Sequence, residues 1–208
     1  MSIPFFVFFL FCWLARVMGG RVEVKLKGGP SPELVKVSKC TTVASGILKT
    51  TTGHNVSLSS DVLTFDTNGM EVEFQSCQPN FGNFNGTNGS PVGGHLRVKS
   101  NGECLSLLSP LTNPPFAVVS APCYDSDDSG QTFLNVVRQS DGRIYFVGNT
   151  QVNGSWTFFH SQCLSGYFGP SGIPTSGDVQ LNCVKNVTGH AVGFTGLFER
   201  NSTQTLIR

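Results

Sequence analysis

The chain carries few charged side chains and has no strong excess of either sign. Charged residues make up 13% of its 208 positions, about half the usual share of a globular protein. Lysines and arginines number 14 against 13 aspartates and glutamates, and no segment gathers them into a basic stripe. Because phosphate backbones are bound by such stripes, nucleic acid is excluded as an expected partner.

Long hydrophobic runs are scarce too, and the main one lies at the amino terminus. Residues 5–15 are all apolar, a run too short for the roughly 20 residues of a membrane helix but suited to a secretory signal. A buried core helix is the alternative, but the clustered phenylalanines form no amphipathic pattern. The sequence therefore predicts a signal peptide over 1–20 and one domain over 21–208, secreted, with no membrane span after signal removal.

Sustained helical periodicity is also missing. The sequence contains 24 glycines and 11 prolines, which interrupt every stretch long enough for an amphipathic helix. Between them lie short apolar segments rich in Val, Phe, Leu and Ile. Short strands separated by turns at this spacing predict an all-β sandwich or barrel.

The signatures of common catalytic sites are absent from the sequence. It has no Gly-x-Ser-x-Gly elbow, and its 4 histidines are scattered. No two cysteines have C-x-x-C spacing and no two histidines have ligand spacing, so neither a zinc site nor a cofactor is expected. We therefore expect a protein that is not an enzyme.

Cysteines, by contrast, are well represented. Six remain after the signal: Cys40, Cys77, Cys104, Cys123, Cys163 and Cys183. An even number in a secreted chain predicts disulfides, although sequence alone leaves every pairing open.

One segment of the chain occurs twice. In residues 102–146 a Cys-Leu pair is followed by an apolar run into Cys123 and by the triplet 131–133, Gln-Thr-Phe. Residues 162–165 match 103–106, and residues 179–183 match the strand that ends at Cys123. Such self-similarity predicts a repeat architecture.

The repeat suggests how the cysteines pair. Pairing within the copies joins Cys104 to Cys123 and Cys163 to Cys183, over similar spacings. In a first copy the same scheme would join Cys40 to Cys77.

That first copy is expected to end on a strand over 72–77. Its apolar residues are out of phase with those of the other copies, which requires either a bulge or a different alignment. The three repeats are expected at about 38–83, 94–142 and 143–200.

With these motifs the chain resembles the ricin B-type lectins, in particular their small secreted fungal members, over about residues 38–200. The resemblance implies a disulfide-stapled β-trefoil of three repeats with four strands each, in which Phe133 replaces a core tryptophan. It also implies carbohydrate binding, with glycans or glycoproteins as partners.

The resemblance further indicates where a sugar would bind. Family members place an aspartate two residues after the first cysteine, here Ser106 and Ser165. They place a stacking ring two residues before the second cysteine, here Ala121 and Leu181. Only Gln131 of the family pattern remains, so the implied sugar site is degenerate.

An acidic segment after Cys123 is the best remaining candidate. Residues 125–130 match the first half of a calcium-binding loop, but Val136 stands where the loop needs a glutamate, which favours a solvated turn. A ring beside carboxylates suits sugar hydroxyls and an apolar sugar face. The predicted carbohydrate site is therefore Tyr124, Asp125, Asp128 and Gln131. Trp156 is expected in the core.

Six Asn-x-Ser/Thr triplets predict a glycosylated surface. Their acceptors are Asn55, Asn85, Asn88, Asn153, Asn186 and Asn201. Two further hypotheses stay open: a protein-binding trefoil such as a secreted protease inhibitor, acting through residues 80–94 or 108–115, and a structural surface protein without a discrete site.

Overall fold

A computed structural model describes residues 39–80, 84–109, 113–125, 134–147, 163, 165–171, 177–187 and 191–200, all within the compact unit Val35–Arg208. The expected signal peptide lies outside these ranges. Within them no helix is both long enough and apolar enough to cross a membrane.

The described residues form twelve strands and one 3₁₀ turn, as the short apolar segments predicted. The elements are β1 (Lys39–Thr50), β2 (Val56–Ser59), β3 (Val62–Phe65), β4 (Glu71–Gln78), η1 (Thr87–Gly89), β5 (Val92–Val98), β6 (Cys104–Leu107), β7 (Phe116–Ala121), β8 (Val136–Arg138), β9 (Ile144–Val147), β10 (Tyr167–Pro170), β11 (Gln180–Cys183) and β12 (Phe194–Glu199).

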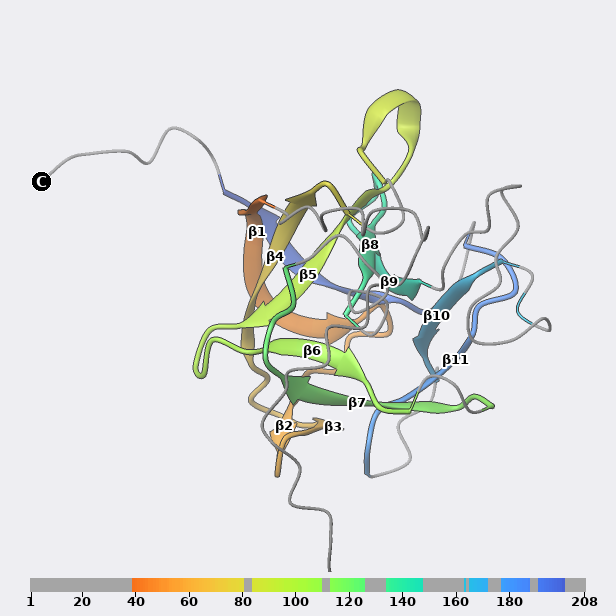
Figure 1. The fold of residues 1–208 in the computed structure, drawn as a ribbon. Helices are drawn as coiled ribbons and strands as arrows, with labels where there is room; N and C mark the ends of the chain where they lie inside the picture. The colour runs from red at the N-terminus through yellow and green to blue at the C-terminus, as the bar shows by residue number, and fades with distance from the viewer. Residues whose placement is uncertain are drawn as a thin grey trace, which may run out of the picture. The chain divides into compact units, whose positions relative to one another are not determined.

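Six of the strands form a closed antiparallel ring. Strand β1 pairs with β4, β4 with β5, β5 with β8, β8 with β9, β9 with β12, and β12 returns to β1. A closed ring leaves no strand edge unpaired. These six strands are the barrel; β1, β4 and β5 lie side by side in Figure 1.

The other six strands form three hairpins, β2–β3, β6–β7 and β10–β11. Each connects two barrel strands, so the order barrel, hairpin, barrel occurs three times, in β1–β4, β5–β8 and β9–β12 (Figure 1). The chain is therefore an all-β, disulfide-stapled β-trefoil of three pseudo-repeats, which confirms the predicted fold class.

Contacts between the hairpins identify equivalent residues in the three repeats. The opposed pairs are Val62 and Val119, Phe116 and Leu181, and Thr64 and Asp178. A single alignment of β3, β7 and β11 agrees with all three pairs. In this alignment Leu63, Val118 and Val179 occupy the same position in their repeats. Each of these side chains is 0% exposed. They form one layer of the apolar core where the three hairpins meet.

The pairing corrects the alignment expected for the first repeat. Cys77 lies on β4, a barrel strand, opposite Cys40 on β1. The strand of the first repeat that corresponds to β7 is instead β3, because β3 and β7 occupy the same place in their hairpins. The apolar residues before Cys77 are out of phase with those before Cys123 and Cys183 because they lie on a barrel strand, whereas β7 and β11 are hairpin strands.

The three disulfides join Cys40 to Cys77, Cys104 to Cys123 and Cys163 to Cys183. They occupy three different places in their repeats. The first links two barrel strands, whereas Cys104 begins the hairpin strand β6 and Cys163 lies ahead of β10. The similar spacings of 19 and 20 residues in the second and third disulfides therefore do not mark equivalent positions.

Truncation of the central layer should destabilise the fold strongly. Leu63→Ala should lower the free energy of unfolding by about 2–5 kcal/mol, because it leaves a cavity among buried side chains. The matched control is Leu108→Ala, at a leucine that is 51% exposed, where a change within about 0.5 kcal/mol is expected. Urea unfolding measures both values. Equal losses in the two variants would contradict a shared layer at Leu63.

Candidate functional site

The residues after β7 hold half of the predicted carbohydrate site. Tyr124 and Asp125 directly follow Cys123, so the Cys104–Cys123 disulfide anchors their segment to β6. The Tyr124 residue is 41% exposed, and the Asp125 side chain is 53% exposed. Asp128 and Gln131 lie outside the described residues, as does most of the segment that matched a calcium loop. The structure therefore defines the position of the ring and of one carboxylate.

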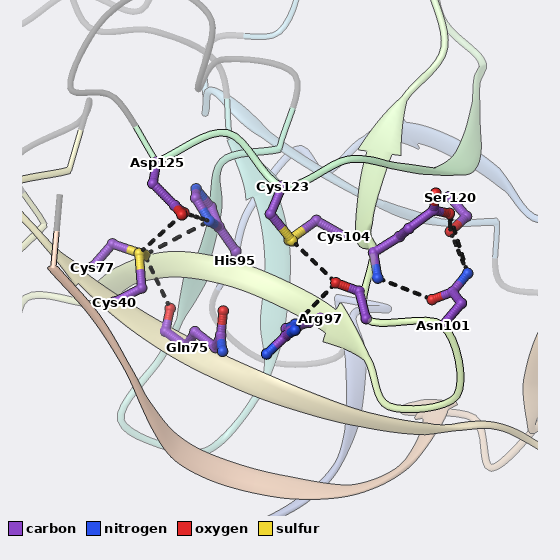
Figure 2. The surroundings of a disulfide bond; sticks show 12 residues. Cys40, Gln75, Cys77, His95, Arg97, Asn101, Cys104, Ser120, Cys123 and Asp125 are labelled. Carbon is purple, nitrogen blue, oxygen red and sulfur yellow. Dashed lines mark hydrogen bonds and ion pairs between the residues drawn. A yellow bond between two sulfur atoms is a disulfide. The ribbon is translucent and has the colours of Figure 1, made fainter. Parts of the chain in front are cut away.

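Asp125 lies against the Cys40–Cys77 disulfide and His95 (Figure 2). Its Oδ1 is 3.7 Å from Nδ1 of His95 and 3.7 Å from Sγ of Cys40. His95 Nδ1 is also 3.7 Å from Sγ of Cys77. Because both sulfurs are in the disulfide, neither carries a hydrogen to donate, and the sulfur–carboxylate contact is not a hydrogen bond. A carboxylate, an imidazole and a disulfide thus meet at one point.

The strands explain how His95 reaches this point. It lies on β5 opposite Gln75 of β4. Gly94, its neighbour, allows the two strands to approach, because a Cβ on Gly94 would lie 1.9 Å from the backbone oxygen of Gln75. No sequence motif marks His95 as a site residue, since its partners are distant in the chain and only the β1–β4–β5 pairing brings them together.

His95 is 1% exposed. Burial lowers the pKa of its imidazole, because the charged form loses its hydration, while the nearby Asp125 carboxylate acts in the opposite direction. The pKa of His95 therefore lies below the ordinary histidine value, and the imidazole is neutral at pH 7.

A second polar cluster supports the turn between β5 and β6, on the other side of the Cys104–Cys123 disulfide (Figure 2). Asn101 Nδ2 donates to Ser120 Oγ at 3.0 Å, and Ser120 Oγ donates to Glu103 Oε2 at 2.5 Å. Arg97 Nε donates to the backbone oxygen of Gly102 at 2.9 Å. The polar groups of this cluster bond to other groups of the protein, so the cluster fixes the turn and the hairpin beside Cys123.

The register also locates the sugar-binding positions of the lectin family in each repeat. The aspartate position falls on Ser57, Ser106 and Ser171, and the ring position falls on Asp66, Ala121 and Asn182. For the third repeat this corrects the sequence alignment, which had placed Ser165 and Leu181 there. In fact Ser165 Oγ donates to the backbone oxygen of Val184, within the protein.

None of the described positions carries the family pattern. Ser106 is only 7% exposed. Ser57 Oγ donates to Asp66 Oδ2 at 2.7 Å, and Asn182 Nδ2 donates to Ser171 Oγ at 2.7 Å. In these two repeats the corresponding side chains bond to each other across the hairpin. A sugar bound by the described residues would have to use other groups.

The predicted glycan acceptors fall on the surface wherever they are described. Asn85, Asn88 and Asn186 are exposed, and Asn55 is partly exposed. Asn153 and Asn201 lie outside the described residues, as do Trp156 and Phe133. Glycosylation stays a prediction, as does the core role of the two aromatic residues.

Comparisons with known proteins identify no family. No protein-family model matches the chain. No curated protein sequence matches it either.

Some solved structures are similar in fold. A mutant of Gallus interleukin-1 beta and chicken interleukin 1 beta each have a TM-score of 0.45 and 13% identity over 77% of this chain, covering 99% and 98% of their own. A further Gallus interleukin-1 beta mutant has a TM-score of 0.44 and 16% identity over 76% of this chain and 99% of its own. The similarity concerns the course of the chain and says nothing about its ligands.

Asp66 provides a test of the cross-hairpin bonds. Two hydrogen bonds lower the pKa of the Asp66 carboxyl. The one from the Ser57 hydroxyl has the larger effect, and the one from the backbone N–H of Asn68 comes second. Because the folded-state pKa lies below the unfolded one, the ionised carboxylate stabilises the fold at neutral pH, and this contribution is lost as pH falls through the folded-state pKa.

Asp66→Asn should therefore lower the melting temperature at pH 7, and the difference from the unsubstituted protein should shrink as pH falls below about 3.9, the ordinary aspartate pKa. Thermal unfolding followed by circular dichroism across pH measures this. Asp61→Asn is the matched control, at an exposed position whose φ of 63° asparagine also tolerates. A difference that is independent of pH would argue against the charged bond.

Proposed function

We propose that the protein is a secreted, non-catalytic β-trefoil that binds glycans through the surface formed by Tyr124 and Asp125. The observation that carries the proposal is their placement. Tyr124 is 41% exposed, and the side chain of Asp125, the next residue in the chain, is 53% exposed. A ring can cover the apolar face of a sugar while a carboxylate accepts hydrogen bonds from its hydroxyls.

The rigidity of this segment supports the proposal. Cys123, which precedes Tyr124, is tied to β6 by a disulfide, and Asp125 rests against the His95 side chain. Binding residues on a loop held by a rigid scaffold lose less conformational entropy when a ligand is bound. Asp128 and Gln131 are the sequence-predicted partners that would complete the site.

Secretion is part of the same proposal. Three disulfides are typical of proteins that fold in an oxidising compartment. The predicted signal at residues 1–20 and the predicted glycan acceptors favour the same localisation.

A glycan array tests the binding site. Tyr124→Ala and Asp125→Asn should each weaken binding by about tenfold or more, because hydrogen bonds to charged groups and aromatic contacts contribute roughly 1–3 kcal/mol each. The matched controls are Phe198→Ala, at a residue that is 76% exposed, and Asp61→Asn. They should leave the array signal unchanged. Binding that survives both site variants would refute this location, and silence of the unsubstituted protein would refute glycan binding.

A protein partner is the second candidate, and an exposed apolar side chain favours it. Leu108 is 51% exposed where β6 ends, next to Ser109, whose φ of 51° turns the chain sharply. Protruding apolar side chains on constrained loops anchor protein interfaces. This residue begins the 108–115 segment that the sequence suggested for a protease inhibitor.

The two candidates differ in a measurable way. A protease-inhibiting trefoil should inhibit secreted proteases, and Leu108→Asp should abolish this inhibition, because a charge replaces the apolar anchor. Tyr124→Ala should leave it intact. Inhibition that is insensitive to Leu108→Asp would exclude this loop as the inhibitory element.

A further inference from the structure

Four groups that can bind metals converge around the Cys40–Cys77 pair (Figure 2). The ligand atoms of Cys40, Cys77 and His95 all lie within 4.8 Å of one another, and among the described residues they form the one cluster of three or more possible ligands. Asp125 Oδ1 completes a ring. The separations from Cys77 Sγ to His95 Nδ1, from His95 Nδ1 to Asp125 Oδ1, and from Asp125 Oδ1 to Cys40 Sγ are each 3.7 Å.

These separations resemble those between the ligands of zinc. Tetrahedral zinc, with Zn–S distances of about 2.3 Å and Zn–N or Zn–O distances of about 2.0–2.2 Å, separates its ligand atoms by roughly 3.3–3.8 Å. Three sides of the ring are already close to that length. The fourth side, between the two sulfurs, is closed by their covalent bond.

We propose that reduction of the Cys40–Cys77 disulfide creates a zinc site whose ligands are Cys40, Cys77, His95 and Asp125. A dithiol reductant supplies two electrons and two protons, the S–S bond breaks, two thiols form, and the dithiol becomes a disulfide. Zinc then binds both sulfurs as thiolates, and the two thiol protons pass to solvent. After removal of the metal, thiol–disulfide exchange with an oxidised dithiol, which accepts the two electrons and two protons, restores the Cys40–Cys77 bond.

The barrel can keep the ligands in place when the covalent link is cut. Cys40 and Cys77 face each other in the β1–β4 ladder with their Cα atoms 4.0 Å apart, and the pairs on either side hold the register. His95 lies on β5, the next strand of the closed ring. Three ligands therefore lie on adjacent strands held in register by their ladders, and the two sulfur atoms have to move apart for zinc to bind.

The fourth ligand provides access to the site. The Asp125 side chain is 53% exposed, whereas the His95 side chain is 1% exposed and Cys77 is 0% exposed. An ion can thus arrive from the Asp125 side and meet an imidazole and a sulfur that are shielded from water. A zinc site with this donor set would be structural, since all four positions are filled by the protein.

Cobalt(II) titration tests the site, because tetrahedral cobalt bound to thiolates absorbs in the visible and near-ultraviolet. The full chain, reduced with a phosphine that does not compete for metal, should bind one equivalent of Co²⁺ with these bands, and Zn²⁺ should displace it. The oxidised protein should show no such bands. The expected result is that the cobalt–thiolate bands appear only after reduction and saturate at one equivalent of Co²⁺.

Ligand variants separate a built site from loose thiol binding. His95→Gln and Asp125→Asn should each weaken Co²⁺ binding by at least about tenfold. Removing even a group that only hydrogen-bonds to a metal ligand typically lowers metal affinity by about 10–100-fold. His54→Gln and Asp61→Asn are the matched controls and should bind as the unsubstituted protein does. Binding that is equal in all four variants would overturn the proposal.

Reduction also opens the other two disulfides, so folding has to be followed at the same time. If reduction unfolds the chain, equimolar Zn²⁺ should restore its near-ultraviolet circular dichroism, because metal binding then contributes to folding. The same addition should fail to restore the signal of the His95→Gln variant. A reduced protein that neither binds Co²⁺ at one equivalent nor refolds with Zn²⁺ would refute the site.

Discussion

The pairing of β12 with β1 is the constraint on which the rest of the structure depends. It joins the last strand of the third repeat to the first strand of the first repeat and so closes the barrel. The three hairpins can meet only because this closure brings their parent strands around one core, where Leu63, Val118 and Val179 pack with no exposed surface. Disulfides secure this arrangement at three dissimilar places, and the barrel pairing defines the fold.

Pairing between strands that are distant in the chain also explains why the candidate site contains residues from distant parts of the sequence. Cys40, Cys77 and His95 lie on three neighbouring barrel strands, whereas Asp125 follows a hairpin strand of the second repeat. Backbone ladders hold the first three residues beside one another, and the Cys104–Cys123 disulfide holds the segment that carries Asp125. The site is therefore organised by the scaffold, and its one exposed carboxylate is also the group proposed to bind ligand.

The class of fold could be predicted from the sequence because it depends on local patterns. Glycine and proline spacing excluded long helices, and short apolar segments marked most of the strands. The equivalence of the repeats could not be derived in the same way. Cysteine spacing suggested it, but Cys77 and Cys163 occupy places in their repeats that differ from those of Cys123 and Cys104. Strand pairing over long sequence separations decides such positions, and His95 was missed for the same reason.

The backbone N–H of Arg200 donates to the carbonyl of Val43 at 3.0 Å, just beyond the point where β12 meets β1. The two ends of the trefoil thus leave the barrel side by side. A short peptide linker could join them, and the chain could be opened elsewhere, for example near the exposed turn Thr87–Gly89. In a circular permutant of this kind the repeats would follow one another in a different order around the same core.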